Sequence, residues 1–230
     1  MRPVTIPADG FGPDDAFATS AEAAESGVDL ASLVAARLCH DLVSPLGAIG
    51  NGVELLEMAG EYPGLAKSPE LSLIGESVKA ARARVRFYRA AFGHSPRDQR
   101  TAVTEIAQLA QDYTRGTRLA VEFEVGGDAS RVEARMLLLA LMCMDSAMPW
   151  GGRVLICRSM TGWRVVGEAS RTRSQPGLWG WLGNSATPEA VPETPPQPSE
   201  VHFALLGRLA RQHRRPILWE VDATGGEISF

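Results

Sequence analysis

The chain has 230 residues, of which 22% are charged and 45% hydrophobic, and a formal net charge of −4. This composition is that of a globular protein and excludes collagen-like, disordered and disulfide-framework chains. The acidic balance provides no overall field that favours DNA or anionic lipid. Three scattered cysteines without metal-ligand spacing indicate a reducing compartment.

The N-terminal segment, residues 1–28, is rich in Gly, Pro, Asp and Ala. It lacks the apolar core of a secretory signal, so we expect a flexible arm. The longest near-unbroken apolar run, Met136–Met144, has nine residues, well short of the roughly 20 needed to span a bilayer. We therefore expect a cytoplasmic protein that does not bind membranes.

A long helix is predicted over residues 29–59, because apolar residues recur there every three or four positions. Asp29 suits the N-cap position. Pro45 should bend the helix near its middle, since proline removes a backbone hydrogen bond. The apolar stripe of this helix consists of Leu30, Val34, Leu38, Leu42, Leu46, Ile49, Val53 and Leu56.

A second helix is predicted from the cap Ser68-Pro69 to Gly93. Its heptad seam consists of Leu71, Ile74, Val78, Ala81, Val85, Tyr88 and Phe92. Two such helices joined by a short loop form an antiparallel hairpin. A lone hairpin buries one side only, so we expect two copies to pair as a four-helix bundle. Two helices of a monomeric core are the alternative.

The rest of the chain, residues 97–230, mixes helical and strand patterns. Helices are predicted over 101–114, 130–148 and 202–213, and strands over 118–125, 153–159, 163–169, 217–223 and 227–230. Five prolines within 185–200 predict a flexible loop there. Trp179 and Trp181 are interpreted as core residues. The expected fold class is α+β: a hairpin domain over 29–96, then a two-layer α/β sandwich over 97–230.

His40 is the strongest candidate for chemistry. It projects about half a turn away from the apolar stripe, so it should be exposed. Asp41 can orient its ring, and Arg37 and Ser44 lie one turn away on the same face. An imidazole beside a hydroxyl and a guanidinium can attack a phosphoryl group and hold its charge. An ordinary surface histidine is the alternative. Metal binding would need further ligands on this face, and the sequence offers none.

The segment LCHDLVSPLGAIGNGVELL resembles the H-box of histidine-kinase dimerisation domains, and it is similar in particular to the ChpT family of bacterial histidine phosphotransferases. RAAFG (89–93) and SAMPWGG (146–152) extend this resemblance over about residues 30–230. It implies a dimerising hairpin followed by a degenerate, Bergerat-like ATPase domain. It also implies that His40 is the phosphoacceptor, Asp41 its acidic neighbour and Ser44 its polar partner.

The chain departs from active kinases of this fold where they bind ATP. The stretch LALMCMDSAMPWGG lacks the magnesium-binding asparagine, with only Asp145 as a weak substitute. GEASRTRS, containing Glu168, replaces the glycine-rich nucleotide box, and the proline-rich loop replaces the ATP lid. Without these glycines the close approach of backbone to nucleotide is lost. We expect no cofactor of its own.

Basic residues of the second helix indicate how phosphate arrives. Lys79, Arg82, Arg86 and Arg89 are spaced three or four apart. We refer to these four as the basic row. Such a row would steer an acidic receiver domain, with Arg37, Arg171 and Arg173 as further docking candidates. A solvated helix face is an even alternative, and nucleic-acid binding is disfavoured because the row lacks interleaved aromatics.

The predicted function is a phosphorelay histidine phosphotransferase that acts as a homodimer. His40 would accept phosphate from a phospho-aspartyl receiver and pass it to another receiver. The resemblance implies a hybrid-kinase receiver of the CckA type upstream, CtrA- or CpdR-like regulators downstream, and Mg²⁺ on the receiver. An ATP-dependent histidine kinase and a non-catalytic receiver-docking scaffold are the alternatives.

Overall fold

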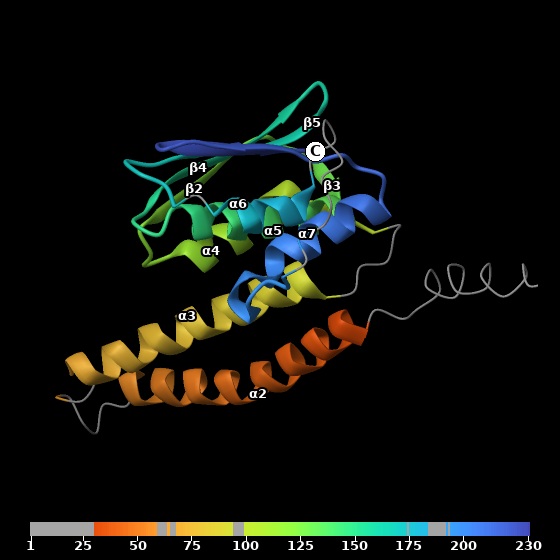
Figure 1. The fold of residues 1–230 in the computed structure, drawn as a ribbon. Coiled ribbons are helices and arrows are strands. Elements are labelled where there is room, and N and C mark those ends of the chain that lie inside the picture. The colour runs from red at the N-terminus through yellow and green to blue at the C-terminus, as the bar shows by residue number, and fades with distance from the viewer. Residues whose placement is uncertain are drawn as a thin grey trace, which may run out of the picture.

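The computed structural model describes residues 30–58, 64, 68–93, 99–173, 175–183, 192 and 194–230, with side chains from residue 33 onward. Two long helices form a hairpin, and the remaining helices lie beneath a mixed sheet (Figure 1). The expected α+β class and the hairpin are confirmed. The predicted arm over residues 1–28 lies outside the described residues.

The hairpin consists of α2 (Leu30–Met58) and α3 (Pro69–Phe92). α2 bends along its length (Figure 1), with Pro45 inside the helix as predicted. α3 begins as predicted, because the Ser68 hydroxyl accepts a hydrogen bond from the Leu71 backbone N–H and Pro69 occupies the first turn. The two helices pack along one side through Cys39, Val53, Leu71 and Val78, all of which are buried.

Five strands form the main sheet in the order β2-β4-β5-β7-β6. They are β2 (Leu119–Glu124), β4 (Gly152–Ser159), β5 (Gly162–Glu168), β6 (Leu218–Val221) and β7 (Gly225–Ser229). β2 and β4 are parallel, and the other pairs are antiparallel. Both predicted hairpins, β4–β5 and β6–β7, are therefore present.

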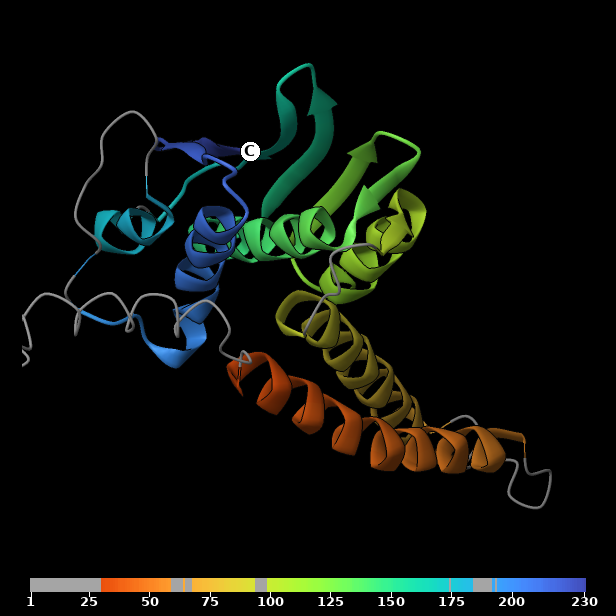
Figure 2. The same ribbon diagram turned by 90° about the vertical axis from the view of Figure 1, so that its right-hand side faces the viewer.

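Helices cover one face of this sheet (Figure 2). They are α4 (Val103–Thr114), α5 (Arg131–Ala147) and α7 (Val201–Gln212), with the short α6 (Pro176–Trp179) and the 3-10 turns η1 (Gly180–Leu182) and η2 (Pro198–Glu200). α5 is the central helix, capped by reciprocal bonds between Ser130 and Glu133. The apolar run Met136–Met144 is buried throughout, so it is a core helix segment.

Three sequence predictions need correction or limits. Residues 101 and 102 belong to a short strand, β1 (Arg100–Ala102), which pairs with β3 (Asp128–Ser130); neither strand was predicted, because three residues carry too little periodicity. Within the predicted loop 185–200, residues 198–200 form η2, and residues 184–191 and 193 lie outside the described residues. Trp179 is a core residue as expected, packed against Phe203 and Trp219, whereas Trp181 is half-buried.

The carboxy-terminal end of α3 is part of the sheet domain's core. Phe87 and Ala91 are fully buried, and the Phe87 ring stacks on Tyr113 of α4 with centroids 4.0 Å apart. The Arg135 guanidinium of α5 donates hydrogen bonds to the carbonyls of Ala91 and Phe92, at 3.2 and 3.4 Å. The predicted boundary between the domains, at residues 96 and 97, lies outside the described residues. α3 belongs to both units, because it packs against α2 and its last turns are buried in the core of the sheet domain.

Much of the predicted apolar stripe of α2 is exposed in the single chain. Val34, Leu38, Leu42, Ile49 and Leu56 are each between 43% and 59% exposed. On α3, Ile74 of the heptad seam is 48% exposed. These residues of the stripe therefore lie outside the contact between α2 and α3, whereas Val53 of the stripe is buried in that contact. Leu33–Met58 has the length and the mean hydropathy (1.2) of a membrane-spanning helix. Core helices of soluble proteins and signal sequences reach the same values.

Candidate functional site

His40 lies on the outer side of α2, exposed to solvent. Its side chain is 81% exposed, whereas Cys39, the residue before it, is buried against α3. At 100° per residue, His40 lies on the opposite side of α2 from Leu38 and Ile49. The expectation that the ring is exposed is therefore confirmed.

The ring is held by a carboxylate. Nδ1 of His40 lies 3.1 Å from Oδ1 of Asp41, and the Arg37 guanidinium donates to Oδ2 of Asp41 at 2.8 Å. The hydrogen bond from His40, followed by that from Arg37, lowers the pKa of Asp41, so this carboxylate stays ionised at neutral pH. An ionised carboxylate only accepts hydrogen bonds, so Nδ1 carries the proton. Nε2 then keeps its lone pair, directed away from this bond.

Ser44 is exposed one turn after His40 on the same side of α2, as the spacing predicted. The structure thus brings together His40, Asp41 and Arg37 by direct contacts and places Ser44 beside them. The arrangement is an exposed nucleophilic nitrogen on a rigid helix, with a cation and a hydroxyl nearby. Such a site can form and hold a phosphorylated imidazole.

The basic row runs along the side of α3 that borders α2. All four side chains are exposed. Arg82 passes over Gly50 of α2, where a Cβ would lie 3.1 Å from the guanidinium Nη1. Burial raises the pKa of the Cys39 thiol, and the charge of Arg89 partly offsets this. The charge of Arg89 thus acts on the residue that precedes His40.

Arg171 and Arg173 belong to the segment after β5, not to the basic row. The Arg171 guanidinium lies 3.7 Å from the ring centroid of Trp150, which is 41% exposed. The backbone N–H of Arg173 donates to the Ala147 carbonyl at the end of α5. These contacts give Arg171 a partner within the chain that the sequence did not predict. A docking role for Arg171 and Arg173 stays a prediction.

Asp145 is the residue that the sequence suggested as a substitute for the missing magnesium-binding asparagine. Its carboxylate accepts a hydrogen bond from the Tyr113 hydroxyl at 3.3 Å. Burial raises the pKa of Asp145, and the Tyr113 bond and the charge of Arg84 oppose this. Burial and the Asp145 charge also raise the pKa of Tyr113. Asp145 is thus engaged with α4 and α3, and sequence reasoning missed both of its partners.

Methionine side chains fill the space between the end of α5 and strands β4 and β5. A Cβ on Gly167 would lie 2.9 Å from Met148 Cε and 3.2 Å from Met144 Sδ, and a Cβ on Gly152 would lie 3.1 Å from Met148 Sδ. Both methionines are nearly fully buried. The layer beneath β4 and β5 is therefore closely packed at this end.

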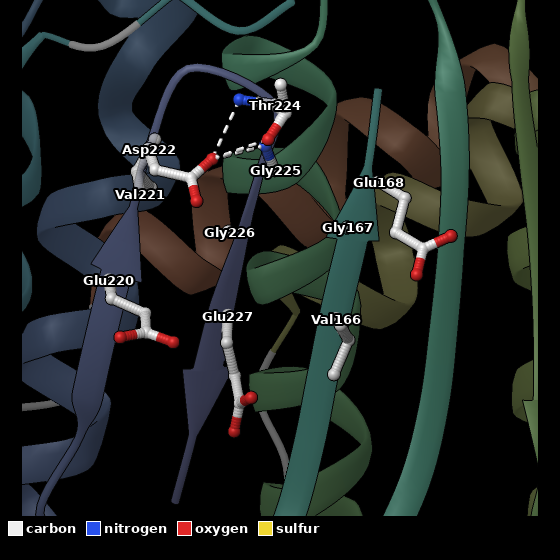
Figure 3. A pocket seen from close by; sticks show the side chains of 10 residues that line it. All are labelled: Val166, Gly167, Glu168, Glu220, Val221, Asp222, Thr224, Gly225, Gly226 and Glu227. Carbon is white, nitrogen blue, oxygen red and sulfur yellow. Dashed lines mark hydrogen bonds between the residues drawn. The ribbon is translucent and has the colours of Figure 1, made fainter. Parts of the chain in front are cut away.

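A hollow of about 480 Å³ lies on the opposite face of the sheet, over β5, β6 and β7 (Figure 3). Four carboxylates line it: Glu168, Glu220, Asp222 and Glu227. Asp222 accepts hydrogen bonds from the backbone N–H groups of Thr224 and Gly225, and Glu227 pairs with Arg164. Like charges would repel a phosphate here. Within the described residues, no group of three or more His, Cys, Asp or Glu side chains could hold a metal ion.

Comparison with known proteins places this geometry in a family. Residues 103–225 match the family model of the histidine phosphotransferase C-terminal domain. The chain belongs to this family.

Individual relatives agree with the family. The protein phosphotransferase ChpT of Brucella abortus (strain 2308) is 35% identical over 137 residues, which are 57% of this chain and 61% of that protein. The chain thus matches about three fifths of that relative's length. The 1.7 Å structure of a bacterial phosphotransferase superposes with a TM-score of 0.62 at 26% identity, covering 89% of this chain and 96% of that one. The predicted resemblance to ChpT-type histidine phosphotransferases is confirmed.

The family match begins at residue 103, after the helix that carries His40. It therefore covers the sheet domain, and the assignment of His40 depends on the geometry of α2. Two partners found only in the structure, Tyr113 of Asp145 and Trp150 of Arg171, left no signal in sequence spacing because each contact joins separate segments of the histidine phosphotransferase fold.

Proposed function

We propose that the chain is a phosphorelay phosphotransferase in which His40 accepts a phosphoryl group from a phospho-aspartyl receiver and passes it to a second receiver. The observation that carries this proposal is the exposed His40 ring with Nδ1 bonded to Asp41. That bond leaves Nε2 as the nucleophile on a side of α2 that a partner can reach. Family membership supports the same activity.

The reaction balances without an external proton. The Nε2 lone pair of His40 attacks phosphorus in line, the bond between phosphorus and the aspartyl oxygen breaks, and the aspartate leaves as a carboxylate. The ring becomes positively charged, and the ionised Asp41 stabilises it through the Nδ1–H bond. Arg37 keeps Asp41 in place. Transfer to the next receiver reverses these steps.

The phosphotransferase is proposed to work without ATP and to carry no cofactor. Met144 and Met148 are buried and fill the space between α5 and strands β4 and β5, which leaves no room there for a nucleotide. The segment after β5 is bonded at Thr172 and Arg173 to neighbouring backbone, instead of forming a glycine-rich loop. These features support a degenerate, Bergerat-like domain. Mg²⁺ for the phosphoryl oxygens is expected from the receiver.

We further propose that two hairpins pair as a four-helix bundle. The apolar stripe of α2 is half exposed in the single chain, and an uncovered stripe of this size favours association. His40 lies on the opposite side of α2 from the stripe, so pairing leaves it accessible. The stripe also accounts for the hydropathy of α2 without a membrane. A cytoplasmic homodimer fits these features.

The proposed partners are acidic receiver domains. Lys79, Arg82 and Arg89 present positive charge beside the His40 turn, which suits the acidic pocket of a receiver. The resemblance to the ChpT family suggests a CckA-like hybrid kinase as donor and CtrA- or CpdR-like regulators as acceptors. No role in nucleic-acid binding is proposed.

The decisive experiment incubates the full chain with a radiolabelled, phosphorylated receiver. The wild type should acquire acid-labile label, and His40→Gln should acquire none. His213→Gln, which changes a histidine at the end of α7, should label normally. Asp41→Asn should slow labelling by about tenfold or more, because the ring loses its charged partner. Full labelling of His40→Gln would favour a docking scaffold, and micromolar binding of Mg²⁺-ATP would favour a histidine kinase.

A further inference from the structure

We propose that residues 1–29, which are the predicted N-terminal arm with the adjoining Asp29 and are called the arm below, bind the basic row of their own dimer and compete there with the acidic receiver. The arm would act as a built-in competitive inhibitor of receiver docking. This inference rests on the proposed phosphotransfer function, because it assigns a regulator to the same docking surface.

The basic row has unsatisfied charge. Lys79, Arg82 and Arg89 form no ion pair with any carboxylate among the described residues. Arg86 reaches Asp112 at 3.5 Å, but Asp112 also lies 2.9 Å from Arg115. Among the described residues, three cations on one side of α3 therefore lack an anionic partner. This matters because the chain as a whole carries a net charge of −4.

The row lies close to the place where the arm joins the fold. α2 begins at Leu30, ten residues before His40, which is about 15 Å along a helix. Arg82 lies over Gly50, and the charge of Arg89 acts on Cys39, so the row follows α2 on the His40 side of the hairpin. An arm leaving the start of α2 would only have to turn back along this side.

The arm has the charge that the row lacks. Its acidic residues are Asp9, Asp14, Asp15, Glu22, Glu25 and Asp29, and Arg2 is its single basic residue. Twenty-nine extended residues reach about 95 Å at ~3.3 Å per residue, far more than the distance to the row. A tether of this kind gives an effective concentration in the mM range, so weak ionic contacts suffice for partial occupancy.

The arm and the receiver would bind the basic row through the same kind of group, the carboxylate. A receiver presents carboxylates to the row, and the arm presents carboxylates in cis. A contact that is individually weak but tethered raises the receiver concentration needed for half-maximal rate and leaves the chemical step at His40 unchanged. Because the contacts are exposed ion pairs, salt should weaken them.

Carbodiimide coupling tests the contact without any phosphotransfer. Lys79 and Lys67 are the only lysines in the chain, and only Lys79 belongs to the row. The reagent condenses a carboxylate with a neighbouring lysine amine, with loss of one water. In the full chain at low salt we expect an amide between an arm carboxylate and Lys79, identified by peptide mass spectrometry. Lys79→Arg should keep the charge and abolish this adduct.

Kinetics test the consequence. A full-length variant carrying Asp9→Asn, Asp14→Asn, Asp15→Asn, Glu22→Gln and Glu25→Gln should show a KM for phosphorylated receiver about threefold lower, with kcat unchanged. The difference should vanish near 1 M salt. A matched control removes five exposed carboxylates of the sheet domain by the substitutions Glu105→Gln, Glu124→Gln, Asp128→Asn, Glu168→Gln and Glu220→Gln, and should leave KM close to wild type.

The outcomes separate this inference from the proposed function. An arm–Lys79 adduct with the expected fall in KM supports competition. Normal labelling of His40 with neither the adduct nor a change in KM overturns the inference and leaves the phosphotransferase intact. Equal KM changes in the arm variant and in the matched control would overturn it too, since net charge alone would then be responsible.

Discussion

The proposed bundle can be tested by truncating two residues of the apolar stripe, with Leu38→Ala and Ile49→Ala in one chain. Leu38 is 59% exposed and Ile49 is 50% exposed, so about half of each side chain remains to be buried by a partner. Fully burying such a side chain contributes about 1.5–3 kcal/mol, so the exposed half contributes about 1 kcal/mol. Two residues in two chains give about 4 kcal/mol, or roughly a thousandfold weaker dimer.

Sedimentation equilibrium over a dilution series measures this change. The wild type should be dimeric, and the double variant should shift to monomer at concentrations about a thousandfold higher. Leu55→Ala is the control, because Leu55 is 68% exposed and projects about 100° or more away from Leu38 and Ile49 around α2. Circular dichroism should show folded chains in all three proteins. A wild type that is monomeric at high concentration, or a double variant that dimerises as tightly as Leu55→Ala, would refute the bundle.

Four further predictions concern stability, three in the sheet domain and one, Gly47→Ala, in α2 of the hairpin. Burial lowers the pKa of His202 to about 4 from 6.5, so the unfolded chain takes up a proton first as pH falls. Stability should therefore decline between pH 6.5 and 4, with about 2 kcal/mol lost from pH 7 to pH 5 in urea titrations, and His202→Gln should lack this loss. Tyr113→Phe keeps the ring but removes the hydroxyl bonded to Asp145, and should cost about 1–2 kcal/mol; an unchanged urea midpoint would contradict the bond. Gly207→Ala would clash with the carbonyl of residue 181 and should cost about 1–3 kcal/mol, whereas Gly47→Ala meets no atom within 4 Å and should gain about 0.5–1 kcal/mol.

Sequence periodicity was sufficient to predict the position of elements that bury one face. The hairpin helices, α5 and both antiparallel hairpins were predicted to within a few residues, because each shows a clear repeat or a glycine turn. The exposure of His40 followed from its angle to the stripe. The contact between His40 and Asp41 was also predictable, since adjacent residues on a helix need no knowledge of the fold.

Contacts between distant segments were not predictable. Asp145 was considered for a ligand role, but its bond to Tyr113 joins residues 32 positions apart in the chain. Arg171 was interpreted as a docking residue, and only the fold reveals Trp150 beneath it. Arg86 was grouped with the other cations of the basic row, yet Asp112 of α4 lies within 3.5 Å. A single sequence contains no period or spacing that encodes such pairs.

The shared helix α3 limits how this protein can be divided. Its last turns supply Phe87 and Ala91 to the centre of the sheet domain, and Arg135 closes its end. A fragment comprising only the hairpin would expose the Phe87 ring and the Ala91 methyl group to water, while the remaining fragment would have a cavity where they fit. The hairpin that carries His40 therefore shares its core with the sheet domain and cannot be excised as an independent unit.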